Sequence, residues 1–268
     1  MSLKPSFPRL RRDHPLANGL IAAYECWQNT PDESSVVGQP QTLIGAASPG
    51  IKPSAWGPAR SYNGTSQHHT GDFDASRLND YPFSIVTAFR INALGDKCLA
   101  SLSSTSLNHY LAFFQVGSRG WEYQIRRGGT TFDSTNFAVA NGGAIDTLPH
   151  IAAMVSDSEA SHSLYIDGVL IEQDTNTCSF PSPTRTTLAA RRNQNTLDFR
   201  SSAELAFLRI YNRALGPTDL AKYQADPFAM FRPRTRSYFA FFADGAPPDP
   251  PTAPRRRQKP QLIGCGVI

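Results

Sequence analysis

LYIDGVLIEQ, residues 164–173, is the stretch that decides the fold. Leu164 and Ile166 alternate with other side chains, and the same alternation resumes in the second half of the stretch, which is the period of a half-buried strand. Asp167 and Gly168 stand between the two halves, and both residue types accept positive φ at low cost. The stretch therefore predicts a tight β-hairpin.

The second informative stretch is AELAFLRIYNRALGPTDLAKY, residues 203–223. Aromatic and β-branched residues crowd its first half, which is typical of a strand. Gly216 suits the N-cap of a helix, Pro217 its first position and Asp219 the positive end of its dipole. The helix has to end before Pro227, because the residue preceding a proline disfavours the helical conformation.

Together these two stretches resemble the closing half of the laminin-G-like, concanavalin A-like jelly-roll superfamily. The matching features are the "LY-DG" hairpin and the "R-YNRAL" strand that leads into a short helix. The continuation DPFAMFRP, residues 226–233, resembles a segment found directly after this domain in structural proteins of tailed bacteriophages and prophages. The resemblance implies an all-β fold: a two-sheet antiparallel jelly-roll sandwich with one short helix and extended N- and C-terminal arms.

Segments upstream and downstream supply the other strands. FSIVTAFRI, residues 83–91, alternates cleanly and resembles a family strand that usually carries a Trp where Phe89 stands. Residues 186–190 resemble a family strand that normally ends in glycine, where Ala189 and Ala190 stand instead. The further strands that we expect lie at 20–26, 60–62, 98–101, 110–116, 121–126, 130–132 and 151–155.

Length and composition favour one β-rich domain with many turns. The chain has 268 residues, with 21 Pro, 19 Gly and only 18% charged residues. A chain of this length can bury a sizeable core, and a β-sandwich of this size is commonly one domain. We predict an N-terminal extended arm at residues 1–15, a jelly roll at 16–231 and an assembly arm at 232–268.

Charge separates the body of the chain from its two ends. Residues 1–15 hold four Lys or Arg against one acidic residue, and residues 232–268 hold seven against two. Residues 16–231 therefore keep 15 basic against 19 acidic residues, a net charge of −4. A basic arm suits an acidic protein partner as well as nucleic acid. Because the body shows no basic stripe with interleaved aromatics, nucleic acid is not an expected partner.

The C-terminal arm has the composition of a segment that needs a partner. Residues 238–242 contain four aromatics, residues 247–260 contain six prolines, and the last seven residues read LIGCGVI. Such a segment prefers extended polyproline geometry and cannot form a core alone. Its apolar end suits docking on a neighbouring subunit, by strand addition or in a groove. The predicted assembly contacts with neighbouring chains are Arg255, Arg256, Arg257, Leu262, Ile263, Val267 and Ile268.

Carboxylate pairs raise the question of glycoside hydrolysis, which needs an acid and a nucleophile on either side of the sugar bond. No candidate pair stands in an aromatic-rich strand, as it would in the hydrolases of the family. We therefore predict no catalytic residues and no enzymatic activity. The candidate pairs are Asp72 with Asp74, Glu172 with Asp174, and Asp198 with Glu204.

The Asp, His and Cys residues of the sequence do not follow the spacings of known metal-binding or redox motifs. Asp72, Asp74 and Asp157 stand in loops, where laminin-G-like domains use carboxylates to bind calcium, but they follow no ligand spacing. We expect no cofactor, with calcium as the alternative. His68-His69 lacks further ligands at metal spacing and is expected to be a surface pair. The cysteines are too far apart for a CxxC site and are expected to be free thiols: Cys26, Cys98, Cys178 and Cys265.

The N-terminal residues lack the apolar region of a signal peptide, and no run approaches the ~20 apolar residues of a membrane span. We expect synthesis in a host cytoplasm and no membrane contact.

These features support two functions from different classes. The first hypothesis is a non-enzymatic structural protein located in the virion of a tailed phage, with capsid decoration favoured over a tail or fibre component. Its terminal arms would hold it against other virion proteins and copies of itself. The alternative is a carbohydrate-binding or host-adhesion module for surface glycans, because superfamily members place exposed Trp or Tyr rings against sugars; a glycoside hydrolase ranks third. The candidate glycan contacts are Trp56, Tyr110, Trp121 and Tyr123.

Overall fold

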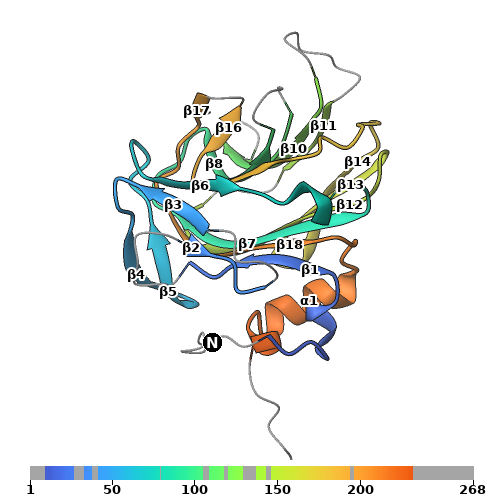
Figure 1. Cartoon of the computed structure of the whole chain (residues 1–268), viewed down its shortest axis with the longest axis horizontal. Helices are drawn as coiled ribbons and strands as arrows, with labels where there is room; N and C mark the ends of the chain where they lie inside the picture. The colour runs from blue at the N-terminus through green and yellow to red at the C-terminus, as the bar shows by residue number, and fades with distance from the viewer. Residues whose placement is uncertain are drawn as a thin grey trace, which may run out of the picture. The chain divides into compact units, whose positions relative to one another are not determined.

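The fold is seen in a computed structural model of the whole chain (Figure 1). It describes residues 10–26, 33–37, 42–78, 80–104, 109–117, 120–128, 137–142, 146–193 and 196–231. The chain divides into two compact units, Met1–Pro233 and Arg234–Ile268, and the described residues all belong to the first. All statements below concern that unit.

Two antiparallel sheets pack face to face as a sandwich, as the sequence predicted (Figure 1). Sheet 1 runs in the order β14-β13-β12-β7-β18-β5-β4, and β1 pairs with a separate part of β18. The strands of sheet 1 are β1 (Leu20–Tyr24), β4 (Gly50–Ser54), β5 (Gly57–Ser61), β7 (Phe83–Ile91), β12 (Pro149–Ser158), β13 (Ser161–Ile166), β14 (Val169–Asp174) and β18 (Ala203–Tyr211).

Sheet 2 runs in the order β11-β10-β9-β8-β15-β6-β3-β2. Its strands are β2 (Glu33–Ser34), β3 (Thr42–Ala46), β6 (His68–Asp72), β8 (Lys97–Ser103), β9 (Tyr110–Val116), β10 (Gly120–Arg126), β11 (Phe137–Gly142) and β15 (Arg185–Leu188). A separate hairpin joins β16 to β17. The remaining elements are β16 (Arg191–Asn193), β17 (Thr196–Asp198), α1 (Pro217–Ala225) and the short 3-10 helices η1 (Pro15–Ala17), η2 (Ala75–Arg77) and η4 (Ala229–Phe231).

The main core fills the space between the sheets, and a second apolar layer covers the outer face of sheet 1. Strand β7 shows both, because Ile85 and Phe89 point into the main core while Val86 and Ala88 point into the second layer. The second layer is closed by α1 and the residues after it, which lie under sheet 1 in Figure 1. Both faces of sheet 1 are therefore apolar at its centre, which explains the long buried runs of β7 and β18.

The predicted hairpin and helix are confirmed. Asp167 and Gly168 join β13 to β14 with φ of 51° and 79°, the pair of positive values that a tight hairpin turn needs. Gly216 is the N-cap of α1, which begins at Pro217. Strand β7 has the bounds that its alternation predicts. The strand expected at 130–132 lies outside the described residues.

Ala189 is one of the two alanines that stand where the family resemblance predicts a glycine. It adopts φ of 60°, the left-handed region that glycine favours. Its N–H donates to Leu99 O at 2.8 Å, and its carbonyl accepts from Ser201 N at 2.8 Å. These bonds hold the alanine in a backbone conformation that costs about 1–2 kcal/mol for a residue with a Cβ. The bend is thus kept without the glycine.

The described part of the predicted N-terminal arm, residues 10–15, packs on the sandwich. Arg11 N donates to Met230 O at 2.7 Å, and Leu10 packs against the second apolar layer. The other predicted domain boundaries remain predictions.

A buried ion pair between Arg209 and Glu25 connects the segments that form the second apolar layer. Arg209, on β18, is 0% exposed and donates through Nε and Nη2 to the two carboxylate oxygens of Glu25, each at 2.8 Å. Its Nη1 donates to Pro227 O at 2.5 Å. Aromatic rings surround the guanidinium, with the Phe207 centroid 3.9 Å away. Burial acts to lower the pKa of Arg209, but the Glu25 charge outweighs it and the pKa lies above its ordinary value.

We expect Arg209→Met to lower the free energy of unfolding by about 3–5 kcal/mol, because it leaves the Glu25 charge buried without its guanidinium. Urea denaturation followed by fluorescence measures the loss. The control is Lys222→Met, which removes an ion pair with Asp219 at 3.6 Å on the exposed side of α1 and should cost under about 1 kcal/mol. Equal losses in the two variants would contradict a structural role for the buried pair.

Candidate functional site

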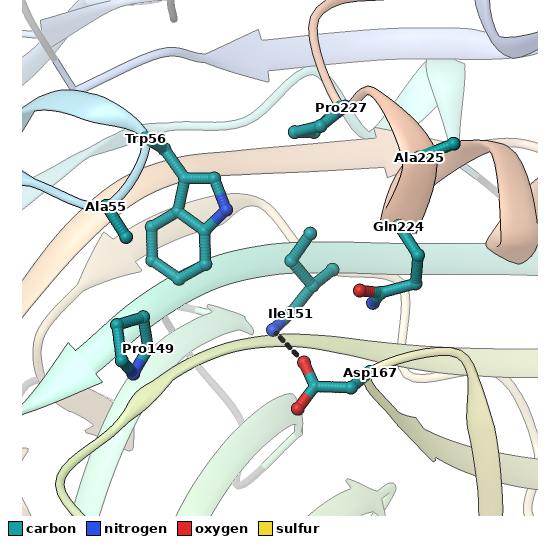
Figure 2. Close-up of a pocket in the computed structure, with 8 residues that line it drawn as sticks. All are labelled: Ala55, Trp56, Pro149, Ile151, Asp167, Gln224, Ala225 and Pro227. Atoms are coloured by element: carbon teal, nitrogen blue, oxygen red, sulfur yellow. Dashed lines mark hydrogen bonds between the residues drawn. The ribbon is translucent and has the colours of Figure 1, made fainter. Parts of the chain in front are cut away.

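A pocket of about 350 Å³ opens on the outer face of sheet 1 (Figure 2). Three places in the fold meet there: the tip of the β4–β5 hairpin, the start of β12 with the β13–β14 turn, and the end of α1. We call it the Trp56 pocket. Its lining includes Trp56, Pro149, Ile151, Asp167, Gln224 and Pro227.

Trp56 is placed by the turn of the β4–β5 hairpin. Ser54 pairs with Gly57, which leaves Ala55 and Trp56 as a two-residue tip. Ser54 Oγ donates to Gly57 O at 2.6 Å and accepts from Trp56 N at 3.2 Å, and Gly57 supplies a φ of 97°. The tip therefore presents a half-buried Trp56 ring that packs against the edge of the second apolar layer. In Figure 2 the Trp56 ring and the Gln224 side chain stand on opposite sides of Ile151.

Asp167 supplies the carboxylate of the pocket, and three bonds fix it. Its N–H donates to Ile151 O at 2.8 Å, and its Oδ1 accepts from Ile151 N at 2.9 Å. Its Oδ2 lies 2.7 Å from His150 Nδ1. Each carboxylate oxygen has two lone pairs, so Asp167 keeps acceptor capacity toward the pocket.

Gln224 reaches the pocket from α1. Its side chain runs beside Gly168, where an added Cβ would lie 3.1 Å from Gln224 Cγ. The hairpin turn and α1 are therefore in close contact, and glycine suits position 168 because of its positive φ and because a Cβ would displace Gln224. Figure 2 shows the Gln224 carboxamide and the Asp167 carboxylate on the same side of the pocket.

The arrangement suits a ligand with one apolar face and a rim of hydroxyl groups. The Trp56 ring offers a flat apolar surface, Ile151 an apolar floor, and Asp167 an acceptor. Gln224 can both donate and accept. An apolar hollow with a few convergent polar groups is the usual form of a small-ligand site, and the volume lies in the usual range.

His150 joins the pocket to a second carboxylate behind it. Its Nδ1 lies 2.7 Å from Asp167 Oδ2 and its Nε2 lies 2.9 Å from Asp146 Oδ1. Both partners are acceptors, so both ring nitrogens must donate, which requires the protonated imidazolium. The hydrogen bond to Asp167 raises the pKa of His150; burial opposes this, and the bond to Asp146 adds to it.

Of the four predicted glycan contacts, Trp56 alone lines this pocket; the other three point elsewhere. Trp121 and Tyr123 are buried in the main core, where Trp121 packs edge-on against Phe89 at 5.0 Å between centroids. Tyr110 is buried under Arg191 on the outer face of sheet 2. Predicting these three rings as surface contacts was wrong, because they fill the apolar positions of their strands.

In two of the candidate carboxylate pairs, one member has a structural role. Asp74 caps η2 by accepting from Ser76 N at 3.1 Å, whereas the Asp72 side chain is largely exposed at the end of β6. Asp198 holds Arg191 through two bonds, of 2.8 and 2.5 Å, on the β16–β17 hairpin, whereas Glu204 belongs to β18 in sheet 1.

Glu172 and Asp174 lie together on strand β14, and neither lines the Trp56 pocket. The expected surface histidine pair is also corrected: His69 is fully buried, with Nδ1 2.8 Å from the Tyr62 hydroxyl. His68 is buried as well, at 9% exposure, so the prediction of a surface pair was wrong for both residues.

Within the described ranges, no group of three or more His, Cys, Asp or Glu side chains is arranged to hold a metal ion. The calcium alternative stays an untested prediction. Cys26, Cys98 and Cys178 are buried thiols outside any disulfide, as predicted, and Cys265 lies outside the described residues. No helix in the described part of the chain has the length and apolar character that crossing a bilayer requires. The predicted assembly contacts, Arg255 to Ile268, also fall outside the described residues.

Most of the Trp56 pocket is missed by reasoning from the sequence. In the sequence, Asp167 is recognisable only as a turn residue, and Gln224 only as part of a helix. One signal was available: His150 stands near the start of β12, and Asp167 stands in the turn that directly follows β13, the strand paired with β12.

Comparison with known proteins supports the fold. The family model described as the concanavalin A-like lectin/glucanases superfamily matches residues 63–221, more than half of the chain. A comparison with curated proteins gave no match.

Solved structures with a similar fold are bacterial toxin binding domains. The binding domain of botulinum neurotoxin serotype D/C VPI 5993 has a TM-score of 0.59 and 13% identity over 77% of this chain and 52% of that one. The binding domain of Paraclostridial Mosquitocidal Protein 1 gives 0.60 and 11%, over 77% and 52%. The binding domain of botulinum neurotoxin DC in complex with SialylT gives 0.59 and 12%, over 77% and 51%. This chain spans about half the length of each, and the likeness shows the fold alone.

The His150 cluster predicts a pH dependence of stability. The pKa of His150 is raised in the folded chain, so its contribution is complete below the unfolded value of about 6.5 and is lost as pH rises through the folded pKa. Burial lowers the pKa of His14, His68, His109 and His162, and these act in the opposite direction. The comparison of wild type with His150→Gln at each pH isolates the one residue.

We expect the difference in free energy of unfolding between wild type and His150→Gln to be largest below about pH 6.5 and to shrink above it. Denaturant titrations from pH 5 to 9 measure it. A difference that grows with pH would show that His150 is neutral in the folded chain and would contradict the doubly donating arrangement.

Proposed function

Because the chain belongs to the concanavalin A-like lectin/glucanase superfamily, we propose that it is a non-enzymatic carbohydrate-binding module whose ligand occupies the Trp56 pocket. The observation that carries the proposal is the pocket itself, in which the Trp56 ring faces the Asp167 carboxylate and the Gln224 carboxamide across an apolar floor. A sugar ring fits this chemistry, because one face of a pyranose is lined by C–H groups and its edge by hydroxyls.

Binding fits the carboxylates of the pocket better than hydrolysis does. A glycoside hydrolase needs two carboxyl groups, about 5–5.5 Å or about 6.5–9.5 Å apart, on either side of the bond. Asp167 is the acidic residue among those that line the pocket, and two hydrogen bonds hold its carboxylate to β12. A fixed single carboxylate is suited to orient a hydroxyl group. The binding domain of botulinum neurotoxin DC is in complex with SialylT, but for this chain the ligand is proposed from the pocket.

The first test is a glycan array with the full chain, followed by titration of the best ligand. Trp56→Ala should weaken binding about tenfold or more, since burial of a large apolar side chain contributes ~1.5–3 kcal/mol and 1.4 kcal/mol is a factor of ten. Gln224→Ala should also weaken binding without changing the melting temperature, because the side chain is exposed.

The matched control is Phe199→Ala, which removes an exposed aromatic ring that packs over Arg191 on the β16–β17 side of the molecule. It should leave glycan binding unchanged. The proposal is wrong if no glycan binds, or if Trp56→Ala and Phe199→Ala reduce binding equally.

A second candidate is the virion role. The resemblance of DPFAMFRP to phage structural proteins and the basic, apolar-ended segment at 232–268 favour it. It is compatible with glycan binding, since a protein displayed on a particle can carry a binding pocket on its outer domain.

For this role we expect deletion of residues 246–268 to leave the melting temperature of the jelly roll unchanged and to abolish incorporation into the particle. Thermal unfolding of the truncated chain checks the first result, and quantitative gel analysis of purified particles checks the second. Full incorporation of the truncated chain would contradict the role given to the arm.

A further inference from the structure

The Trp56 pocket combines an aromatic ring with a carboxylate, and this pair of groups also suits a positively charged ligand. The Trp56 ring is half-buried, whereas the Asp167 side chain is 43% exposed and is therefore accessible from the pocket. The face of a Trp ring attracts a cation, and a carboxylate pairs with an ammonium group through charge-assisted hydrogen bonds. Among the described residues that line the pocket, none is a Lys or an Arg. The lining thus carries a negative charge without a lysine or arginine of its own to offset it.

The cluster behind Asp167 has more negative than positive charge. His150 Nδ1 lies 2.7 Å from Asp167 Oδ2, and its Nε2 lies 2.9 Å from Asp146 Oδ1. Two carboxylates therefore share one imidazole, and protonation of that imidazole offsets one of the two negative charges. Asp167 thus belongs to a negative cluster even when His150 is an imidazolium. The cluster favours a ligand that brings a further positive charge.

The charged residues next to the other lining residues offset each other. Asp226 directly follows α1, and Arg90 is the register partner of Pro149. Arg90 Nε donates to Thr147 O at 3.1 Å, and the Arg90 side chain is exposed to water, in which salt screens its charge. Because one acidic and one basic residue stand here, they do not neutralise the negative charge of the Asp167 cluster.

The end of α1 adds negative potential at the pocket. The helix spans Pro217–Ala225, and its last two residues, Gln224 and Ala225, line the pocket. The C-terminal end of a helix carries a partial negative charge, which favours a cation nearby. The Lys222 ammonium in the last turn lies 3.6 Å from Asp219 of the first turn. The helix end and the Asp167 cluster therefore favour the same sign of charge in a ligand.

We propose that the Trp56 pocket is selective for a saccharide that carries a protonated amino group, with the ammonium paired with Asp167 and the sugar ring against Trp56. This inference rests on the proposed function and adds the charge of the ligand. The C–H face of an amino sugar can pack on the aromatic ring as that of a neutral sugar does. The Gln224 carboxamide, on the same side of the pocket as the Asp167 carboxylate in Figure 2, can accept from the ammonium or bond a neighbouring hydroxyl.

Saccharides of other charge fit the pocket less well. An acidic saccharide would bring its carboxylate towards Asp167 and the negative end of α1, and like charges repel. A neutral saccharide can donate a hydroxyl to Asp167, but a hydrogen bond is stronger when both of its partners are charged. The amino sugar is therefore the ligand that gains most from the carboxylate.

The test compares the trisaccharide of glucosamine, which has free amines, with the trisaccharide of N-acetylglucosamine, whose acetylated amines are neutral. Both are titrated into the full chain at about pH 6, below the pKa of about 7.7–8.0 of an α-amino group. We expect the glucosamine trisaccharide to bind about tenfold more tightly, and we expect this advantage to shrink as salt is added. Trilysine, which has amines but no sugar ring, should bind more weakly than the glucosamine trisaccharide.

Two variants change the charge of the pocket in opposite directions. Asp167→Asn removes the carboxylate charge but keeps an oxygen that can accept from Ile151 N, and Asn tolerates the φ of 51° at this position. It should weaken binding of the glucosamine trisaccharide about tenfold and leave binding of the acetylated form nearly unchanged. Gln224→Glu adds a carboxylate at an exposed position and should strengthen binding of the glucosamine trisaccharide.

The matched control is Asp72→Asn, which removes a carboxylate charge from β6 of sheet 2, where the side chain is 91% exposed. It should leave binding of both trisaccharides unchanged, and melting temperatures check that all variants fold. The proposal is overturned if the acetylated form binds at least as tightly as the free amine, if trilysine binds as tightly as the glucosamine trisaccharide, or if Asp167→Asn and Asp72→Asn weaken binding equally.

A failure of this inference is distinguishable from a failure of the proposed function. Equal binding of the two trisaccharides contradicts the preference for an amine and leaves carbohydrate binding in place. Binding of neither trisaccharide also overturns the preference, and the glycan array then shows whether the chain binds any saccharide.

Discussion

The buried Arg209–Glu25 pair is the interaction on which the functional face of the molecule depends. Glu25 comes directly after the first strand, Arg209 lies in the last, and the third bond of the guanidinium goes to Pro227 O, just after α1. Three distant parts of the chain are thereby fixed at one point within a layer of aromatic rings. The end of α1 supplies Gln224 and Pro227 to the Trp56 pocket, so a buried charge pair sets the geometry of a surface site. Removing one member of a buried pair costs more than the intact pair adds in net stability, because the remaining charge is left buried.

The two outer faces of the sandwich have opposite characters, and this results from the segments that cover them. The face of sheet 1 is apolar and is covered by α1 and the residues after it. A hollow remains where the end of α1 lies near the tip of the β4–β5 hairpin. The face of sheet 2 carries arginine and hydroxyl side chains beside the β16–β17 hairpin. The first face suits a ligand that stacks in a pocket.

Strands and turns could be predicted from the sequence because they depend on local rules. Alternation gave β7, and the Asp167-Gly168 pair gave the hairpin, since both act over a few residues. The site depended on contacts between distant segments. The sequence alone does not distinguish a Trp that is buried in the core, as Trp121 on β10 is, from one that lines a pocket, as Trp56 at a hairpin tip does. The burial of Arg209 was equally hidden, because its carboxylate partner lies 184 positions earlier.

The walls of the Trp56 pocket come from outside the part of the chain that defines the family. The match covers residues 63–221, which includes the floor at Ile151 and the carboxylate of Asp167. Trp56 precedes that segment, and Gln224 and Pro227 come after it. The jelly roll thus supplies a rigid base, while the β4–β5 hairpin and the end of α1 supply the groups that would select a ligand. Rigid elements with variable additions are the usual way in which one fold serves many functions. The ligand of this chain therefore has to be sought from its own pocket residues rather than from the ligands of similarly folded proteins.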